Sequence, residues 1–165
     1  MTEKAIVLAG GCFWGMETLL RSLPGLLDTA VGYANGDSEA HASYQIVCTG
    51  LTGFREAVRV WYDADVIPLK QLLFVFFAAV EAAPRPDFCT ELTPLKNFFR
   101  AEEYHQRYLE KNPGGYCHIS PATTAMLARW DYDDAAYTRP AAWILRDHRD
   151  ALRRAETLRE LGYTE

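Results

Sequence analysis

Apolar residues recur along the chain with two different spacings, and each spacing predicts a type of element. An apolar run at residues 5–9 predicts a buried strand. Apolar side chains then recur every three or four positions from Phe13 to Leu23, which predicts a helix that begins at or just after Cys12. In residues 57–62, side chains with a period of two form one side that is wholly apolar, which predicts a strand. Strand and helix periods therefore both occur in the first part of the chain.

Later stretches predict further elements. We expect a short strand at residues 28–33, a largely buried helix at residues 69–80, a weak strand at residues 88–92 and a helix at residues 97–111. His105 falls on the inward face of the last of these helices, where a hydrogen-bonded core histidine is the simpler interpretation. Residues 44–47 fit either a short helix or an extended segment.

The C-terminal part shows weaker patterns. Residues 120–138 are irregular or contain one short helix near residues 124–129. From residue 140 onward, apolar positions mark an amphipathic helix with arginines on its other side. This helix either packs on the rest of the chain or mediates self-association, and packing is the simpler expectation.

Composition sets the class of protein. The chain has 165 residues, of which 49% are hydrophobic and 24% charged, which is typical of one globular domain. We expect a single compact α/β (α+β) domain with a small mixed sheet, packed helices and a C-terminal helical extension. A net charge of -5 argues against general affinity for nucleic acid or anionic membranes. We also expect no membrane span and, without a signal peptide before the first strand, a cytoplasmic location.

Two of the four cysteines carry candidate chemistry. Cys12 follows Gly10 and Gly11 at a turn from strand to helix, where the positive helix N-terminus favours a thiolate. A reactive nucleophile and a buried structural cysteine both fit this position. Cys117 follows two glycines, so it could move to another cysteine. Cys48 and Cys89 are expected to pack or to serve as further resolving thiols. The absence of Cys-x-x-Cys pairs argues against a zinc or iron–sulfur site.

A resemblance joins these features. Residues 11–17, Gly-Cys-Phe-Trp-Gly-Met-Glu, resemble the signature of the A-type peptide methionine sulfoxide reductases. The likeness continues at residues 31–33, 44, 52–58, 62–63, 72–77, 101–109 and 116–117. Several separated motifs in the right order cover most of residues 5–119. A domain of residues 1–119 similar to this family, followed by an extension of residues 120–165 that packs on it, is therefore expected.

The resemblance implies reduction of the S-epimer of methionine sulfoxide without a metal or organic cofactor. Cys12 would attack the sulfoxide sulfur and become a sulfenic acid, and Cys117 would form a disulfide that a thioredoxin-like donor reduces. The resemblance implies a substrate site formed by Phe13, Trp14, Tyr33 and Tyr116.

Glu56 is the candidate acid, because a sulfoxide oxygen is a poor leaving group until it is protonated. Burial would raise the pKa of Glu56 enough to keep it protonated at neutral pH. From the residues alone, an exposed carboxylate at Glu56 and a core tryptophan at Trp14 fit equally well. For Tyr33, a half-buried strand tyrosine is the commoner case, and donation of a hydrogen bond to the substrate is the alternative.

One block of the family is missing. After Val80 the chain lacks the Asp-Pro-Thr, Gln-Gly-x-Asp and Gln-Tyr-Arg-Ser segments that supply a second carboxylate and a second tyrosine in the family. Phe54 also stands where histidine is usual. Asp87, Tyr62 and Tyr132 are candidate substitutes, and the sequence does not choose among them.

The sequence therefore predicts thiol-dependent reduction of methionine S-sulfoxide, either peptide-bound or free, with a thioredoxin-like reductant as partner. Two alternatives stay open. One is an enzyme on the same scaffold that transforms another sulfur-containing metabolite. The other is a redox-sensing module without turnover.

Overall fold

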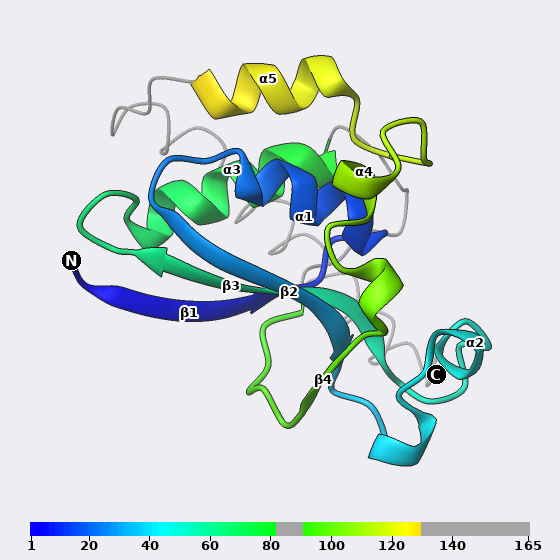
Figure 1. The fold of residues 1–165 in the computed structure, drawn as a ribbon. Coiled ribbons are helices and arrows are strands. Elements are labelled where there is room, and N and C mark those ends of the chain that lie inside the picture. The colour runs from blue at the N-terminus through cyan, green and yellow to red at the C-terminus, as the bar shows by residue number, and fades with distance from the viewer. Residues whose placement is uncertain (82–90, 130–165) are drawn as a thin grey trace, which may run out of the picture.

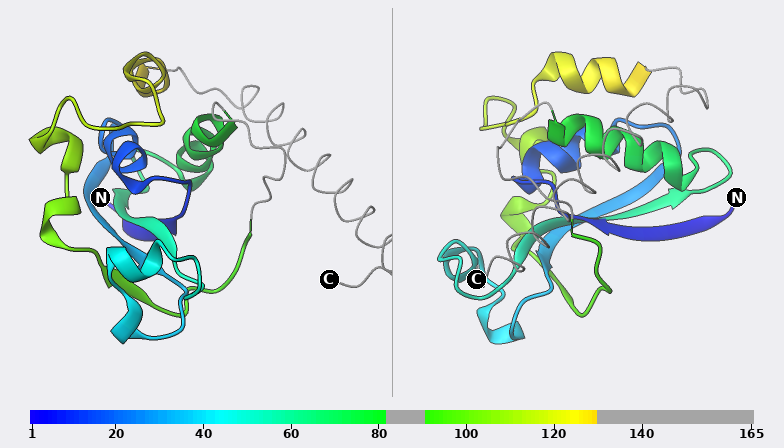
Figure 2. Two further views of the ribbon diagram at one scale, coloured as in Figure 1. Left: turned by 90° about the vertical axis from the view of Figure 1, so that its right-hand side faces the viewer. Right: turned by 180° about the vertical axis from the view of Figure 1, so that it is seen from behind.

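The computed structural model describes residues 1–81 and 91–129. In chain order the elements are β1 (Glu3–Leu8), α1 (Phe13–Arg21), β2 (Leu26–Ala34), η1 (Glu39–His41), α2 (Tyr44–Val47), β3 (Arg55–Asp63), α3 (Leu69–Glu81), β4 (Phe98–Arg100), η2 (Glu103–His105), α4 (Tyr108–Lys111) and α5 (Pro121–Arg129). Figure 1 shows the sheet below α1 and α3, with α5 on the far side of these two helices. The end-on view in Figure 2 shows the same three levels.

Within the described residues, four strands form one sheet in the order β1-β3-β2-β4. The predicted α/β (α+β) fold class is confirmed, but each strand pair is antiparallel rather than mixed. The register of β2 and β3 places Tyr33 opposite Glu56. Two of the predicted site residues therefore lie side by side before any helix is considered.

The core lies between the sheet and the helices α1 and α3. Alternation along β3 turns Val58, Val60 and Tyr62 toward this core, whereas Arg59 faces the other side and lies over the rings of Trp61 and Phe98. The helices contribute buried side chains at helical spacing, namely Met16, Leu19 and Leu20 from α1, and Leu72, Val75, Phe76 and Ala79 from α3. The periodicity thus predicted both helices and the strand between them correctly.

The first strand is less buried than predicted. Glu3, Lys4 and Ala5 are exposed, and only Leu8 of β1 is fully buried. The reason is its position, since β1 pairs with β3 alone and forms an edge of the sheet.

The helix predicted at residues 97–111 is wrong, because tertiary contacts divide this stretch. Phe98–Arg100 forms β4 and pairs with Gly32–Ala34 of β2. A side chain at Gly32 would collide with the Phe99 carbonyl oxygen, so glycine permits this close pairing.

The rest of this stretch is held in place by Gln106 and Arg107. The Gln106 side chain bonds both the N–H and the C=O of Val31, at 3.0 Å each. Arg107 has a left-handed backbone, with φ of 50°, and its N–H donates to buried Glu17 at 2.8 Å. A left-handed residue at this point interrupts any continuous helix.

Other predictions concern shorter segments. Residues 44–47, which fitted either a helix or an extended segment, form the helix α2. The short helix predicted near residues 124–129 is part of α5. The predicted helix from residue 140 onward lies outside the described residues, as do positions 88–90 of the predicted weak strand. None of the helices in the two described ranges has the length and apolar character needed to cross a membrane.

The start of the C-terminal extension is attached to the core through Leu127, which is 1% exposed, whereas its neighbour Met126 is 52% exposed. We expect Leu127→Ala to lower the free energy of unfolding by about 2–5 kcal/mol, because it leaves a cavity against the core. Met126→Ala on the same helix should change it by less than about 0.5 kcal/mol. Thermal and urea unfolding measure both variants, and equal stabilities would show that α5 does not pack as described.

Candidate active site

Cys12 occupies the N-cap of α1, at the end of a turn in which Gly11 has φ of 90°. Only glycine adopts that conformation without strain. The half-buried sulfur makes no capping hydrogen bond to the helix, but the N–H groups of Trp14 and Gly15 are close enough to lower the pKa of the thiol. Burial outweighs them, and with the charges of Glu56 and Cys117 it raises the pKa of Cys12 above its ordinary value. The predicted thiolate is therefore not the form favoured in the free protein.

Glu56 lies directly beside this turn. The Phe13 N–H, one of the free donors at the start of α1, donates to Glu56 Oε2 at 3.1 Å. Burial raises the pKa of Glu56, and the bond from Phe13 only partly offsets that effect. The side chain is half-buried. A carboxyl group with raised pKa next to a thiol is the arrangement that acid-assisted attack by sulfur requires.

A second carboxylate, Glu102, meets the site from the segment after β4. Tyr33, which is 0% exposed, donates its hydroxyl proton to Glu102 Oε2 at 2.6 Å. The Tyr44 N–H donates to Glu102 Oε1 at 2.9 Å. Burial alone would raise the pKa of Glu102, but these two donors outweigh it and hold that pKa below its ordinary value. Burial and the bond to Glu102 also raise the pKa of Tyr33.

Trp14, one of the predicted substrate-site residues, is anchored by His105. Trp14 Nε1 donates to His105 Nδ1 at 3.0 Å, and the Trp14 ring stacks on Tyr108 with centroids 3.8 Å apart. Burial lowers the pKa of His105, which keeps the imidazole neutral so that Nδ1 can accept this bond. Trp14 is half-buried, whereas Phe13 is fully buried between the rings of Tyr33 and His105. The inward position predicted for His105 is confirmed.

Tyr44 is a site residue that the sequence prediction missed. Its ring centroid lies 4.6 Å from that of His105. A hydrogen bond between the Tyr44 hydroxyl and Cys48, together with burial and the nearby charges of Cys48, Glu56 and Cys12, raises the pKa of Tyr44 to about 12. Tyr44 and Glu102 both fall in segments that match the family, and this was the only sequence signal for them.

Cys117 approaches the first turn of α1. A side chain at Gly15 would come within 2.9 Å of Cys117 Sγ, and the charge of Cys117 contributes to the raised pKa of Cys12. The Cys117 thiol donates to the Ile119 carbonyl at 2.7 Å. Tyr116, just before it, is 66% exposed. The structure thus places the expected resolving cysteine beside the expected nucleophile.

Neither Cys48 nor the candidate replacements for the missing carboxylate and tyrosine that the structure describes take the predicted positions. Cys48 is exposed, so its assignment to packing is wrong, and the thiols of Cys12, Cys48 and Cys117 are free. Tyr62 is buried at the opposite end of β3 from Glu56 and does not substitute for the missing tyrosine. Cys89, Asp87 and Tyr132 lie outside the described residues.

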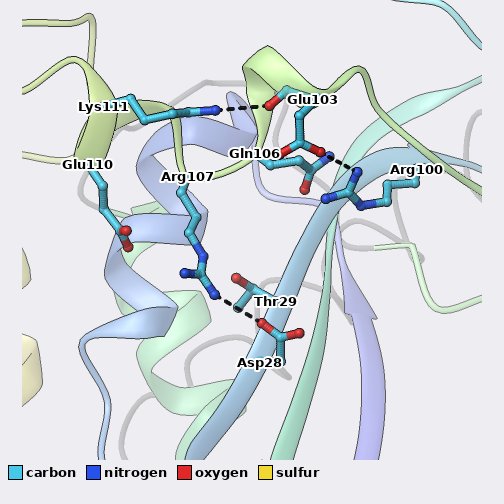
Figure 3. A pocket seen from close by; sticks show the side chains of 8 residues that line it. All are labelled: Asp28, Thr29, Arg100, Glu103, Gln106, Arg107, Glu110 and Lys111. Atoms are coloured by element: carbon cyan, nitrogen blue, oxygen red, sulfur yellow. Dashed lines mark hydrogen bonds and ion pairs between the residues drawn. The ribbon is translucent and has the colours of Figure 1, made fainter.

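A charged cavity of about 300 Å³ lies elsewhere, beside β2 and α4 (Figure 3). It is lined by Asp28, Thr29, Arg100, Glu103, Gln106, Arg107, Glu110 and Lys111. Its cations already contact neighbouring groups, since Arg100 bonds Glu103 at 2.7 Å and Lys111 bonds the Glu103 carbonyl at 2.9 Å. The lining contains no thiol and none of the predicted site residues.

Comparisons with known proteins identify the family of the chain. The family model described as peptide methionine sulfoxide reductase matches residues 4–86 and 80–134. These two matches meet where the sequence lacks the internal block. The peptide methionine sulfoxide reductase MsrA of Clostridium botulinum is 40% identical over 154 residues, which cover 70% of this chain and 98% of that protein. The protein of the same description from Clostridium acetobutylicum is 36% identical, with 70% and 94% covered.

Two solved structures share the fold. Mxr1 from Saccharomyces cerevisiae in reduced form superposes with a TM-score of 0.60 and 35% identity, over 70% of this chain and 88% of that chain. Methionine sulfoxide reductase A of Corynebacterium diphtheriae gives a TM-score of 0.57 and 25% identity, over 70% and 78%. The chain belongs to the peptide methionine sulfoxide reductase family.

Proposed function

We propose that this protein reduces methionine S-sulfoxide, peptide-bound or free, by a thiol-dependent reaction in which Cys12 is the nucleophile and Glu56 the acid. The observation that carries the proposal is the hydrogen bond from the Phe13 N–H to Glu56, which holds a carboxyl group of raised pKa next to the cysteine. Family membership supports the reaction class.

In the first step, Glu56 gives its proton to the sulfoxide oxygen while the Cys12 sulfur attacks. The attack is on the sulfoxide sulfur, so a bond between the Cys12 sulfur and the substrate sulfur forms, and the thiol proton returns to Glu56. This sulfur–sulfur bond and the sulfur–oxygen bond of the substrate then break as the hydroxyl group passes to the Cys12 sulfur. The products are a thioether and a Cys12 sulfenic acid, so two electrons pass from Cys12 to the substrate. The N–H groups of Trp14 and Gly15 favour the attacking thiolate as it forms.

In the second step, Cys117 condenses with the sulfenic acid, and water and a disulfide form. We propose a thioredoxin-like dithiol as the reductant that restores both thiols. A reducing cytoplasm would suit a cycle of this kind, because thiols persist there. The position of Cys117 beside Gly15 supports its role as resolving thiol.

We assign the substrate methyl group to the half-buried face of Trp14. The bond to His105 and the stacking on Tyr108 fix the indole ring, while buried Phe13 supports it from the core side. Tyr116, exposed just before Cys117, would border the substrate. The Tyr33 hydroxyl donates a hydrogen bond to Glu102, so Tyr33 orders the site unless the substrate displaces that bond. Residues 1–119 would carry this chemistry and residues 120–165 would form the packing extension.

Mutation of the two cysteines separates the steps. We expect Cys12→Ser to produce no methionine from the S-epimer with dithiothreitol or thioredoxin. Cys117→Ser should produce one equivalent of methionine per chain and then stall with thioredoxin, because the sulfenic acid cannot become a disulfide. Chromatography of methionine from the S and R epimers measures both. Undiminished turnover by Cys12→Ser would overturn the proposal.

Removal of the Glu56 carboxyl should have two opposite effects. Its charge raises the pKa of Cys12, so Glu56→Gln should lower that pKa and allow Cys12 to ionise at lower pH. Without the acid, the first step should nevertheless slow by about 10²–10⁴-fold. The pH dependence of Cys12 alkylation and single-turnover methionine formation give the two values.

Glu39→Gln, at an exposed position in η1, is the matched control and should change neither quantity. A faster first step in Glu56→Gln would mean that Glu56 only suppresses the thiolate and donates no proton.

We propose Tyr44 as the second donor to the sulfoxide oxygen, because its ring lies against His105 and the nearby charges of Glu56 and Cys12 contribute to its raised pKa. The sulfoxide would replace Cys48 as the hydrogen-bond partner of the Tyr44 hydroxyl. Tyr44→Phe should slow single-turnover methionine formation by about 10²-fold, the usual effect of removing one donor to a developing negative charge. Tyr104→Phe removes a hydroxyl from another ring against His105 and should react like the unmodified protein. Equal rates in all three proteins would exclude Tyr44 as a donor.

A further inference from the structure

His118 lies across the turn that carries Cys12. A side chain at Gly11, just before Cys12, would come within 3.6 Å of His118 Nε2. A side chain at Gly15, one turn later, would come within 3.1 Å of His118 Nδ1. The imidazole therefore reaches the residues on both sides of the nucleophile.

The position that a Cβ atom would take at Gly15 is also close to the resolving thiol. It lies 2.9 Å from Cys117 Sγ as well as 3.1 Å from His118 Nδ1. A ring nitrogen of His118 and the Cys117 sulfur are thus neighbours at the start of α1. The absence of a side chain at Gly15 makes the room for both.

Formation of the disulfide requires a proton to move. The Cys117 thiol must lose its proton to attack, and the hydroxyl of the Cys12 sulfenic acid must gain one to leave as water. In the free protein the Cys117 thiol donates to the Ile119 carbonyl, which accepts a hydrogen bond but does not take up a proton. Near neutral pH an imidazole can take up the thiol proton and then donate a proton to the leaving hydroxyl.

We propose that His118 transfers this proton in the resolving step. It takes the proton of Cys117 as the sulfur attacks the Cys12 sulfenic sulfur, and it gives that proton to the departing oxygen. One S–S bond forms, one S–O bond breaks and one water leaves, with no external oxidant or reductant. The inference rests on the proposed function, because it assigns a residue to the second step of that reaction.

The other charged groups near Cys12 are less suited to this transfer. Glu102 is held as a carboxylate by bonds from Tyr33 and Tyr44, and Glu56 carries a proton again after the first step, so it is not free to take the proton of Cys117. His105 is buried with Nδ1 occupied by Trp14. His118 differs from these groups because it is adjacent in sequence and in space to the attacking thiol.

The test starts from the sulfenic acid. One equivalent of hydrogen peroxide oxidises the Cys12 thiol to the sulfenic acid and forms water, and quenching followed by peptide mapping then times the Cys12–Cys117 disulfide. We expect His118→Gln, which retains polarity and approximate size, to slow this disulfide by at least about tenfold. The sulfenic acid should accumulate and be trapped by dimedone. Added imidazole should restore the rate in His118→Ala in proportion to its concentration.

A parallel single turnover with methionine S-sulfoxide separates the two hypotheses. Wild-type protein that forms no methionine contradicts the proposed function, while the peroxide experiment still reports on His118. Methionine formation in His118→Gln at the wild-type rate, with slow disulfide formation and imidazole rescue, supports the assignment. Wild-type disulfide rates in His118→Gln, or a slow His118→Ala that imidazole does not rescue, would overturn it.

Discussion

The hydrogen bond from the Phe13 N–H to Glu56 is the constraint on which the site depends. It joins the first turn of α1 to the start of β3, and so it fixes the Glu56 carboxyl relative to the cysteine at the N-cap. The strand itself is held on both sides, because β1 ends opposite Val58 and Tyr33 of β2 lies opposite Glu56. A shift of the helix would therefore separate the Cys12 sulfur from the Glu56 carboxyl, whereas the sheet would keep Glu56 in place.

The pKa values of two carboxyl groups at the site, Glu56 and Glu102, are shifted in opposite directions. Glu56 receives one backbone donor, and burial raises its pKa, so it can carry a proton. Glu102 receives a tyrosine hydroxyl and a backbone N–H, and its pKa falls despite burial, so it remains an acceptor. Such divergence distinguishes an acid from a structural anion. In this site Glu56 is suited to chemistry, and Glu102 to fixing Tyr33 and α2.

Periodicity predicted α1, β3 and α3, because their burial follows the local pattern of apolar residues. It failed for residues 97–111, where the apolar spacing is helical but Gln106 bonds Val31 and Arg107 adopts a left-handed backbone to reach Glu17. The position of Cys12 at a helix start was likewise predictable, but its protonation was not. The helix N–H groups act as expected, and burial, which no short motif reveals, outweighs them.

In the absence of the family block, the segment of residues 98–119 makes the contacts that hold the site together. Residues 98–119 pair with β2 at Gly32, bond Glu17 of α1 through Arg107, and place Cys117 at Gly15. The same segment supplies Glu102, which orders Tyr33, and His105, which orders Trp14. Because one continuous segment docks on both the sheet and the helix, the geometry around Cys12 does not depend on a separate strand from the missing block.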